Sequence, residues 1–145
     1  MKTITQNQAI VNSVNVDLLV PARINKSEGE VRGSVVLTSR NESVIDEINI
    51  KLVEAYVRNL GGFSHEEELH LGEVHILPQI QMRAGETRAF PFRLTFEILH
   101  ASERIEFALK VAGENSEKPH FFIEADVDLK GTGADPSVKK DIRME

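Results

Sequence analysis

The chain has 145 residues, no cysteine and a net charge of −6, with an isoelectric point near 5.4. The lack of cysteine excludes disulfides, thiolate metal sites and a cysteine nucleophile. Because no basic run exceeds Lys139-Lys140 and no apolar run approaches the roughly 20 residues that span a bilayer, we expect no nucleic-acid partner and no transmembrane segment.

The N-terminal sequence is polar and lacks the apolar region of a secretory signal, so we expect a cytoplasmic protein. Residues 1–13 alternate only weakly and are expected to form an arm, followed by one domain over 14–145. Apolar residues then recur at every second position in 14–20 and in 31–37, the pattern of half-buried strands. The turn residues Lys26 to Glu30 separate the two.

The middle of the chain changes phase twice. Apolar positions in 48–57 move from one face to the other, which predicts a β-bulge or a strand buried on both faces. Gly61-Gly62 interrupts the pattern, and a second slip follows at Gly72-Glu73. Each glycine is expected at a turn or an irregularity of a strand.

The segment from Ala84 to Phe96 has the clearest alternation. A Gly-Glu turn opens it, and one face then carries four large apolar residues: Phe90, Phe92, Leu94 and Phe96. The period predicts a strand with one buried face and with Arg93 and Thr95 outside. Because Pro91 cannot donate a ladder hydrogen bond, the strand is expected at a sheet edge or a bulge.

Residues 102–113 fit two structures, a strand and a helical stripe behind a Ser102 cap, and we favour the strand. Residues 121–129 form a further strand, with Asp126 and Asp128 on its polar face. Short alternating segments separated by turns predict an all-β protein, a two-sheet antiparallel β-sandwich of about seven to nine strands.

Four segments occur in an order and spacing shared with a known family, over about 14–144. They are Val31-Arg32-Gly33-Ser34-Val35, Ile48-Asn49-Ile50-Lys51-Leu52, Ala84-Gly85-Glu86 followed by Phe90-Pro91-Phe92, and Ala125-Asp126-Val127-Asp128-Leu129. They resemble the arrestin-like (immunoglobulin-like) sandwich and, within it, the bacterial sporulation-control (SpoOM) family. The resemblance implies an intracellular adaptor or regulator that acts through protein contacts, without a catalytic centre, and it transfers no ligand-binding residues.

The histidines are a weak candidate for metal binding. His65, His70 and His75 are evenly spaced beside a run of glutamates. On an ideal strand His65 and His75 share a face but lie roughly 33 Å apart, so one site would need a hairpin or bulge between them. We expect a solvated strand and no metal.

Asp126 and Asp128 share a face at a separation that suits acid–base chemistry. We expect instead that they line an outer face or pair with Arg32 or Arg93. No serine lies in a Gly-x-Ser-x-Gly elbow, and no glycine pair continues into a phosphate loop. We therefore expect no catalytic residue and no cofactor.

The function favoured by these observations is a non-enzymatic protein-binding adaptor or regulatory module, and the alternative is an enzyme or metal-binding sandwich of unknown substrate. The partner, or a second copy of the chain, would dock on a loop or a strand edge, although Lys51, Arg58 and Glu66–Glu68 would blunt an edge. The loop Asn59–Glu68 is the expected contact surface. Its contact residues are Leu60, Gly61, Gly62 and Phe63, and in the alternative it is a plain hairpin whose Phe63 folds back onto the sandwich.

Overall fold

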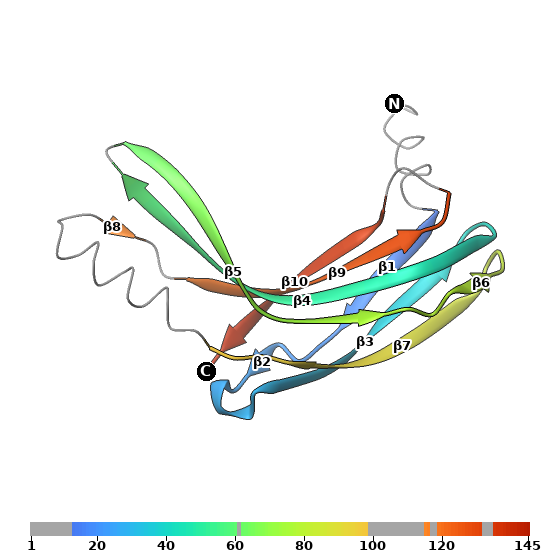
Figure 1. Ribbon diagram of the computed structural model, residues 1–145, viewed down its shortest axis with the longest axis horizontal. Helices are drawn as coiled ribbons and strands as arrows, with labels where there is room; N and C mark the ends of the chain where they lie inside the picture. The colour runs from blue at the N-terminus through green and yellow to red at the C-terminus, as the bar shows by residue number, and fades with distance from the viewer. Residues whose placement is uncertain (1–12, 61, 99–114, 117–118, 132–134) are drawn as a thin grey trace.

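The computed structural model describes residues 13–60, 62–98, 115–116, 119–131 and 135–145 (Figure 1). Most of these residues lie in strands, and their helical content is the short 3₁₀ turn η1 (Lys26–Glu28). The strands are β1 (Val14–Leu19), β2 (Arg23–Ile24), β3 (Glu30–Ser39), β4 (Ser43–Leu60), β5 (Phe63–Ile76), β6 (Ile80–Met82), β7 (Thr87–Thr95), β8 (Asn115–Ser116), β9 (His120–Leu129) and β10 (Ser137–Met144). The ambiguous segment 102–113, and all of the arm except Ser13, lie outside the described residues.

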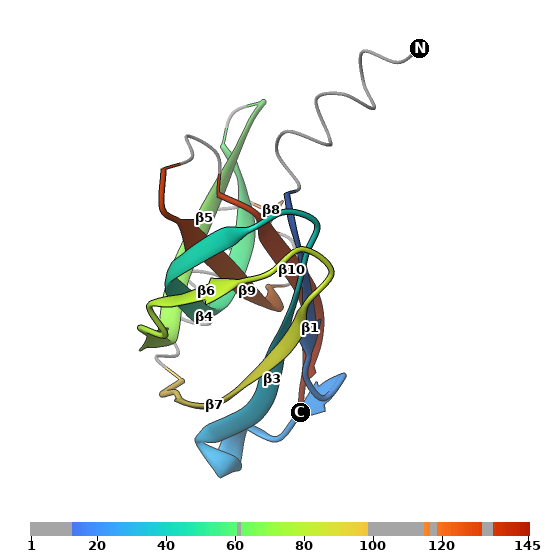
Figure 2. The same cartoon turned by 90° about the vertical axis from the view of Figure 1, so that its right-hand side faces the viewer.

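The strands form two sheets. The smaller has the order β1-β3-β7, and the larger follows β2-β10-β9-β4-β5, with β6 and β8 also paired to β4. Every pairing is antiparallel except that of β10 with β2. The two layers lie against each other (Figure 2). The prediction of an all-β, two-sheet antiparallel sandwich is confirmed.

The core lies between the sheets, where the alternating apolar faces meet. Its fully buried side chains come from strands of both sheets and include Leu18, Val35, Leu37 and Leu94 from the smaller sheet, and Ile48, Ile50, Leu52, Ile123, Ala125 and Val127 from the larger. Most outward positions of the same strands are polar, although Val53, Ala55 and Phe122 are apolar, so each sheet is wetted over most of one side.

Strand β7 is an edge strand, as Pro91 predicts, since β3 is its only neighbouring strand in the smaller sheet among the residues that the structure describes. Its Phe92 is buried, whereas Arg93 is exposed. Phe92 lies directly opposite Gly33 of β3. A Cβ atom at Gly33 would lie 2.9 Å from Cζ of Phe92 and 2.5 Å from the carbonyl oxygen of Leu19. The aromatic ring therefore occupies the space that the glycine leaves.

The predicted phase slip at Gly72-Glu73 corresponds to a β-bulge in β5. Leu52 is opposite Gly72 and Val53 is opposite His70, so Leu71 of β5 is the extra residue. The phase change in β4 has the other predicted cause, burial on both faces, because β4 keeps its register with β9 across Leu52 and Val53. Val53 and Ala55 form a second small buried cluster with Phe122.

The bulge lies where the end of β7 crosses β5. The Glu97 N–H donates to the Leu71 carbonyl at 3.1 Å, and a Cβ atom at Gly72 would lie 2.2 Å from the carbonyl oxygen of Thr95. Only glycine allows this approach of the two backbones. The contact joins the two sheets along one side of the sandwich.

The Phe92→Ala variant should lose about 3–5 kcal/mol of unfolding free energy, because truncation removes a buried ring and leaves a cavity beside Gly33. Urea denaturation measures the loss. Thr95→Ala changes an exposed position of the same strand and should stay within about 0.5 kcal/mol. A loss below about 1 kcal/mol for Phe92→Ala would contradict the burial of this face.

The Gly72→Ala variant should lose about 1–3 kcal/mol, because its methyl group would collide with the β7 backbone rather than with a flexible side chain. Gly62→Asn is the control, since a Cβ atom there meets nothing within 4 Å and asparagine tolerates positive φ. Equal denaturation midpoints for the two variants would show that the sheets do not depend on this close approach.

Candidate functional site

The far halves of β4 and β5 extend away from the sandwich as a hairpin (Figure 1). Their pairing continues without interruption from the bulge to Leu60 opposite Phe63. On one side, β8 pairs with β4 at Arg58 and Asn59. On the other side, residues 63–70 of β5, here called the distal edge, have no neighbouring strand among the residues that the structure describes.

The expected contact loop is largely strand, and the prediction of a loop over Asn59–Glu68 is wrong. Only the turn between Leu60 and Phe63 separates β4 from β5, and Gly62 takes a φ of 91°, which favours glycine. Gly61 and the side chains of Leu60 and Phe63 lie outside the described residues. Their role as contacts stays a prediction.

The two faces of the distal hairpin differ in character. Glu66, Glu68 and His70 alternate onto one face and are exposed. On the other face, Tyr56 is only 4% exposed, and its hydroxyl donates to the carboxylate of Glu67 at 2.5 Å. One face of β5 in the hairpin thus carries solvated charge, while on the other face Glu67 is bonded to Tyr56 of β4.

The bulge also changes the placement of the histidines. It breaks the ideal alternation on which the expected shared face of His65 and His75 rested, and it puts His70 and His75 on the same face. The Nδ1 atom of His75 lies 3.0 Å from Glu47, and its Nε2 lies 3.2 Å from Glu73. No three His, Asp or Glu side chains among the described residues are grouped to hold a metal ion.

Asp126 and Asp128 share the outer face of β9, as predicted, and both have raised pKa values. Burial, followed by the negative charge of Glu124, raises the pKa of Asp126. The negative charge of Asp135 is the main cause of the raised pKa of Asp128. Neighbouring acidic side chains therefore disfavour the charged form of both aspartates, and at Asp128 this is the main cause.

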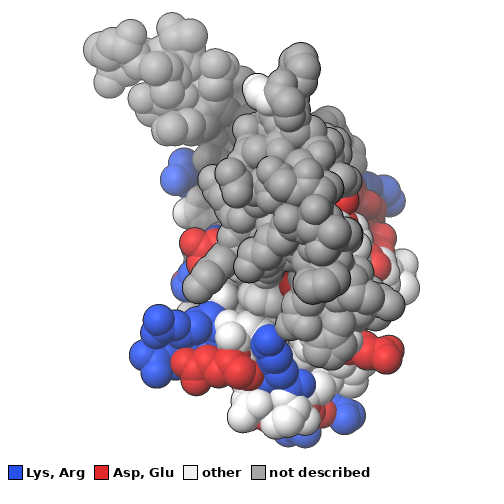
Figure 3. All heavy atoms as spheres, turned by 90° about the vertical axis from the view of Figure 1, so that its left-hand side faces the viewer, with Lys and Arg blue, Asp and Glu red and all other residues white. Residues whose placement is uncertain are grey.

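The expected pairing of these aspartates with Arg32 or Arg93 is wrong. Arg32 and Arg93 are cross-strand neighbours in the smaller sheet, and both donate to Glu30, Arg32 at 2.7 Å. These hydrogen bonds lower the pKa of Glu30. Acidic and basic side chains also lie side by side on the described surface in Figure 3. Outward side chains of opposite sheets cannot reach one another, and the sequence does not show which sheet each strand joins.

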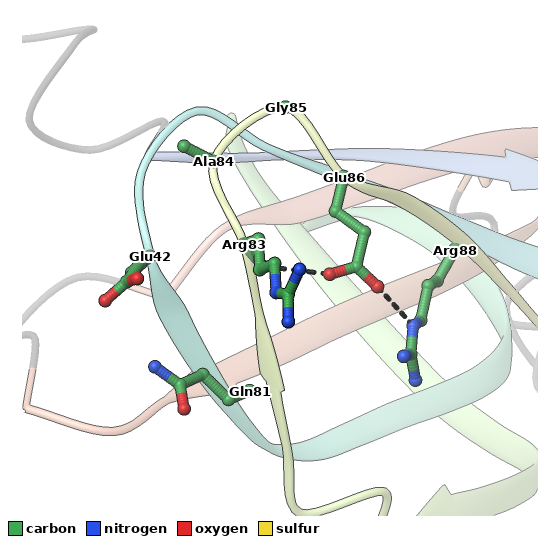
Figure 4. A pocket seen from close by; sticks show the side chains of 7 residues that line it. All are labelled: Glu42, Gln81, Arg83, Ala84, Gly85, Glu86 and Arg88. Carbon is green, nitrogen blue, oxygen red and sulfur yellow. Dashed lines mark hydrogen bonds and ion pairs between the residues drawn. The ribbon is translucent and has the colours of Figure 1, made fainter.

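A hollow of about 880 Å³ lies between the β3–β4 and β6–β7 turns (Figure 4). It is lined by Glu42, Gln81, Arg83, Ala84, Gly85, Glu86 and Arg88. The Glu86 N–H donates to the Arg83 carbonyl at 3.0 Å, and Gly85 has a φ of 82°, as in a type II turn.

The Glu86 carboxylate stabilises this turn. It accepts a hydrogen bond from the backbone N–H of Arg83 at 2.9 Å and another from Nε of Arg88. The Arg83 N–H, followed by Arg88, lowers the pKa of Glu86. A carboxylate held in this way is a poor proton acceptor near neutral pH. The Gly-Glu sequence therefore has a structural role in the turn.

No helix among the residues that the structure describes has the length and apolar character required to cross a lipid bilayer.

The sandwich, its Gly-Glu turn and its edge strand with Pro91 define an arrestin-like β-sandwich protein. A family model described as SpoOM protein matches residues 8–101. The chain therefore belongs to the SpoOM family, as the sequence motifs indicated.

Among solved structures, the chain is similar to Spo0M, a sporulation control protein from Bacillus subtilis, with a TM-score of 0.69 and 21% sequence identity. The match covers 93% of this chain and 50% of that chain, so this chain spans half the length of the solved relative. At this identity the likeness shows the fold alone. No curated protein matches the chain.

Replacing Asp128 by Asn should raise the Tm near neutral pH. The folded-state pKa of Asp128 is raised above 3.8, so its ionised form disfavours folding, and this penalty disappears as the pH falls through the folded-state pKa. The Tm gain should therefore vanish in acid. Thermal melts across the acid range measure it.

Glu30→Gln is the control of opposite sign. The lowered pKa of Glu30 gives stability above its unfolded-state pKa that is lost as the pH falls through the folded-state value. This variant should melt lower than the wild type near neutral pH and match it in acid. Shifts of both variants that do not depend on pH would refute the assigned electrostatics.

Proposed function

We propose that this protein is a non-enzymatic intracellular regulatory module that binds another protein through the hairpin of β4 and β5. The observation that carries the proposal is the extension of this hairpin beyond the sandwich, with the distal edge of β5 open among the described residues. Open strand edges are established docking sites for extended segments of partner proteins.

Three other strand edges in the described part of the chain favour docking less. The edge of β7 contains Pro91, which removes a backbone donor. The edge of β1 lies close to β10, where Lys140 Nζ is 3.7 Å from Asp17. The part of β5 nearest the sandwich is tied to the end of β7 by the Glu97 hydrogen bond to Leu71.

Family membership supports the regulatory part of the proposal. The solved relative from Bacillus subtilis is a sporulation control protein, and control proteins commonly act by contact with other proteins. The alternative, an enzyme or a metal-binding domain, draws less support. Glu30 and Glu86 accept hydrogen bonds from arginine residues, which lower the pKa values of both carboxylates. Asp126 and Asp128 lie on the outer face of a sheet.

The Phe63→Ser variant tests the hairpin as the contact surface. Partner capture by the purified protein from a lysate of its native host should fall several-fold, while the Tm stays unchanged. Gln81→Ser changes an exposed side chain beside the β6–β7 turn and should leave capture unchanged. A lower Tm for Phe63→Ser with unchanged capture would instead make Phe63 a packing residue of a plain hairpin.

A further inference from the structure

The distal edge offers backbone hydrogen-bonding groups over a defined length. Residues 63–70 of β5 pair with β4 on one side only among the described residues. At Leu71 the edge is closed, because the Glu97 N–H donates to the Leu71 carbonyl at 3.1 Å. An added strand would therefore run for roughly 26 Å, at about 3.3 Å per residue, and stop at the sandwich. This is an ordinary length for a strand.

The exposed charges on this edge select the chemistry of the added strand. Glu66 and Glu68 lie on the same face of β5 and are exposed. An adjacent strand would place its side chains about 5 Å from them, where opposite charges stabilise and like charges destabilise. Alternating Lys or Arg residues match this spacing, and the net charge of −6 attracts a basic segment at long range.

The intervening positions require different side chains. On the opposite face of β5, Glu67 accepts a hydrogen bond from Tyr56, and the partly buried Leu69 packs against the core. A strand added at this edge places its alternate side chains beside Leu69 and beside Glu67, whose carboxylate is already engaged by Tyr56. Small or apolar residues suit that face, so the complementary segment is basic at every second position and apolar between.

We propose that the distal edge of β5 binds an extended segment of a partner protein in which Lys or Arg alternates with apolar residues, the basic side chains pairing with Glu66 and Glu68. This inference rests on the proposed function of the hairpin as a protein-contact surface. A second copy of the chain is a poor occupant. An antiparallel pair centred on Glu67 would set Glu66 opposite Glu68, and like charges opposite one another are destabilising.

A pair of synthetic peptides tests the proposal with the full chain. One peptide alternates lysine and valine, and the other carries the same residues as a lysine block followed by a valine block. Fluorescence anisotropy at moderate salt should show tighter binding of the alternating peptide. Hydrogen exchange should then show slower exchange of backbone amides within residues 63–70. Equal binding of the two peptides would mean general charge attraction and overturn the proposal.

Charge reversal supplies the second test. The double variant Glu66→Lys/Glu68→Lys should bind the alternating lysine peptide about tenfold more weakly, because two exposed ion pairs become two like-charge contacts. It should prefer a peptide that alternates glutamate and valine. The matched control Glu28→Lys/Glu42→Lys makes the same change in charge at exposed positions away from β5 and should keep the wild-type preference. Equal losses in the two variants would overturn the proposal.

Two further outcomes separate this inference from the proposed function. If host-partner capture depends on Phe63 but the lysine peptide does not protect residues 63–70, the hairpin contact stands and the basic-strand inference fails. If the wild-type chain dimerises without peptide and Glu66→Gln/Glu68→Gln strengthens the dimer, the occupant of the edge is a second copy and the inference also fails. Matching Tm values and circular dichroism spectra for all variants confirm that they are folded.

Discussion

The close approach of the Thr95 carbonyl to the backbone of Gly72 determines how the two sheets meet. Because glycine leaves room at this point, the end of β7 lies against β5 and Glu97 bonds to Leu71. The carbonyl of the extra residue Leu71 accepts a hydrogen bond from that donor. The extra residue also reverses which faces of β5 the side chains of residues 63–70 alternate onto. Core closure and the direction of the hairpin are therefore consequences of the same local geometry.

Much of this architecture follows from alternation alone. The buried faces of β7 and β9 are those that the sequence pattern predicts, since a period of two assigns each side chain to a face wherever one face meets a core. The bulge was also predictable, because the apolar pattern of β5 slips at Gly72-Glu73. These features depend on neighbours along the chain, which a single sequence contains.

Other features depend on neighbours across the fold, and there the sequence misled. Glu66 to Glu68 have weak strand propensity and follow a glycine pair, so they indicate a loop, yet pairing with β4 overrides that preference. The pairing of Arg32 and Arg93 with Glu30 depends on which strands share a sheet. Alternation assigns a face but not a sheet, so it could not exclude the aspartates of β9 as partners.

Strand β4 is the common neighbour of β5, β6, β8 and β9, and it runs through both the sandwich and the hairpin. The sandwich part is secured by core side chains and by neighbours on both sides, whereas the hairpin beyond Leu71 has fewer described neighbours. Regions with less packing open at a lower free-energy cost than the core. We therefore expect the hairpin to open at a lower free-energy cost than the sandwich, so a partner that orders the hairpin would work against only this smaller cost.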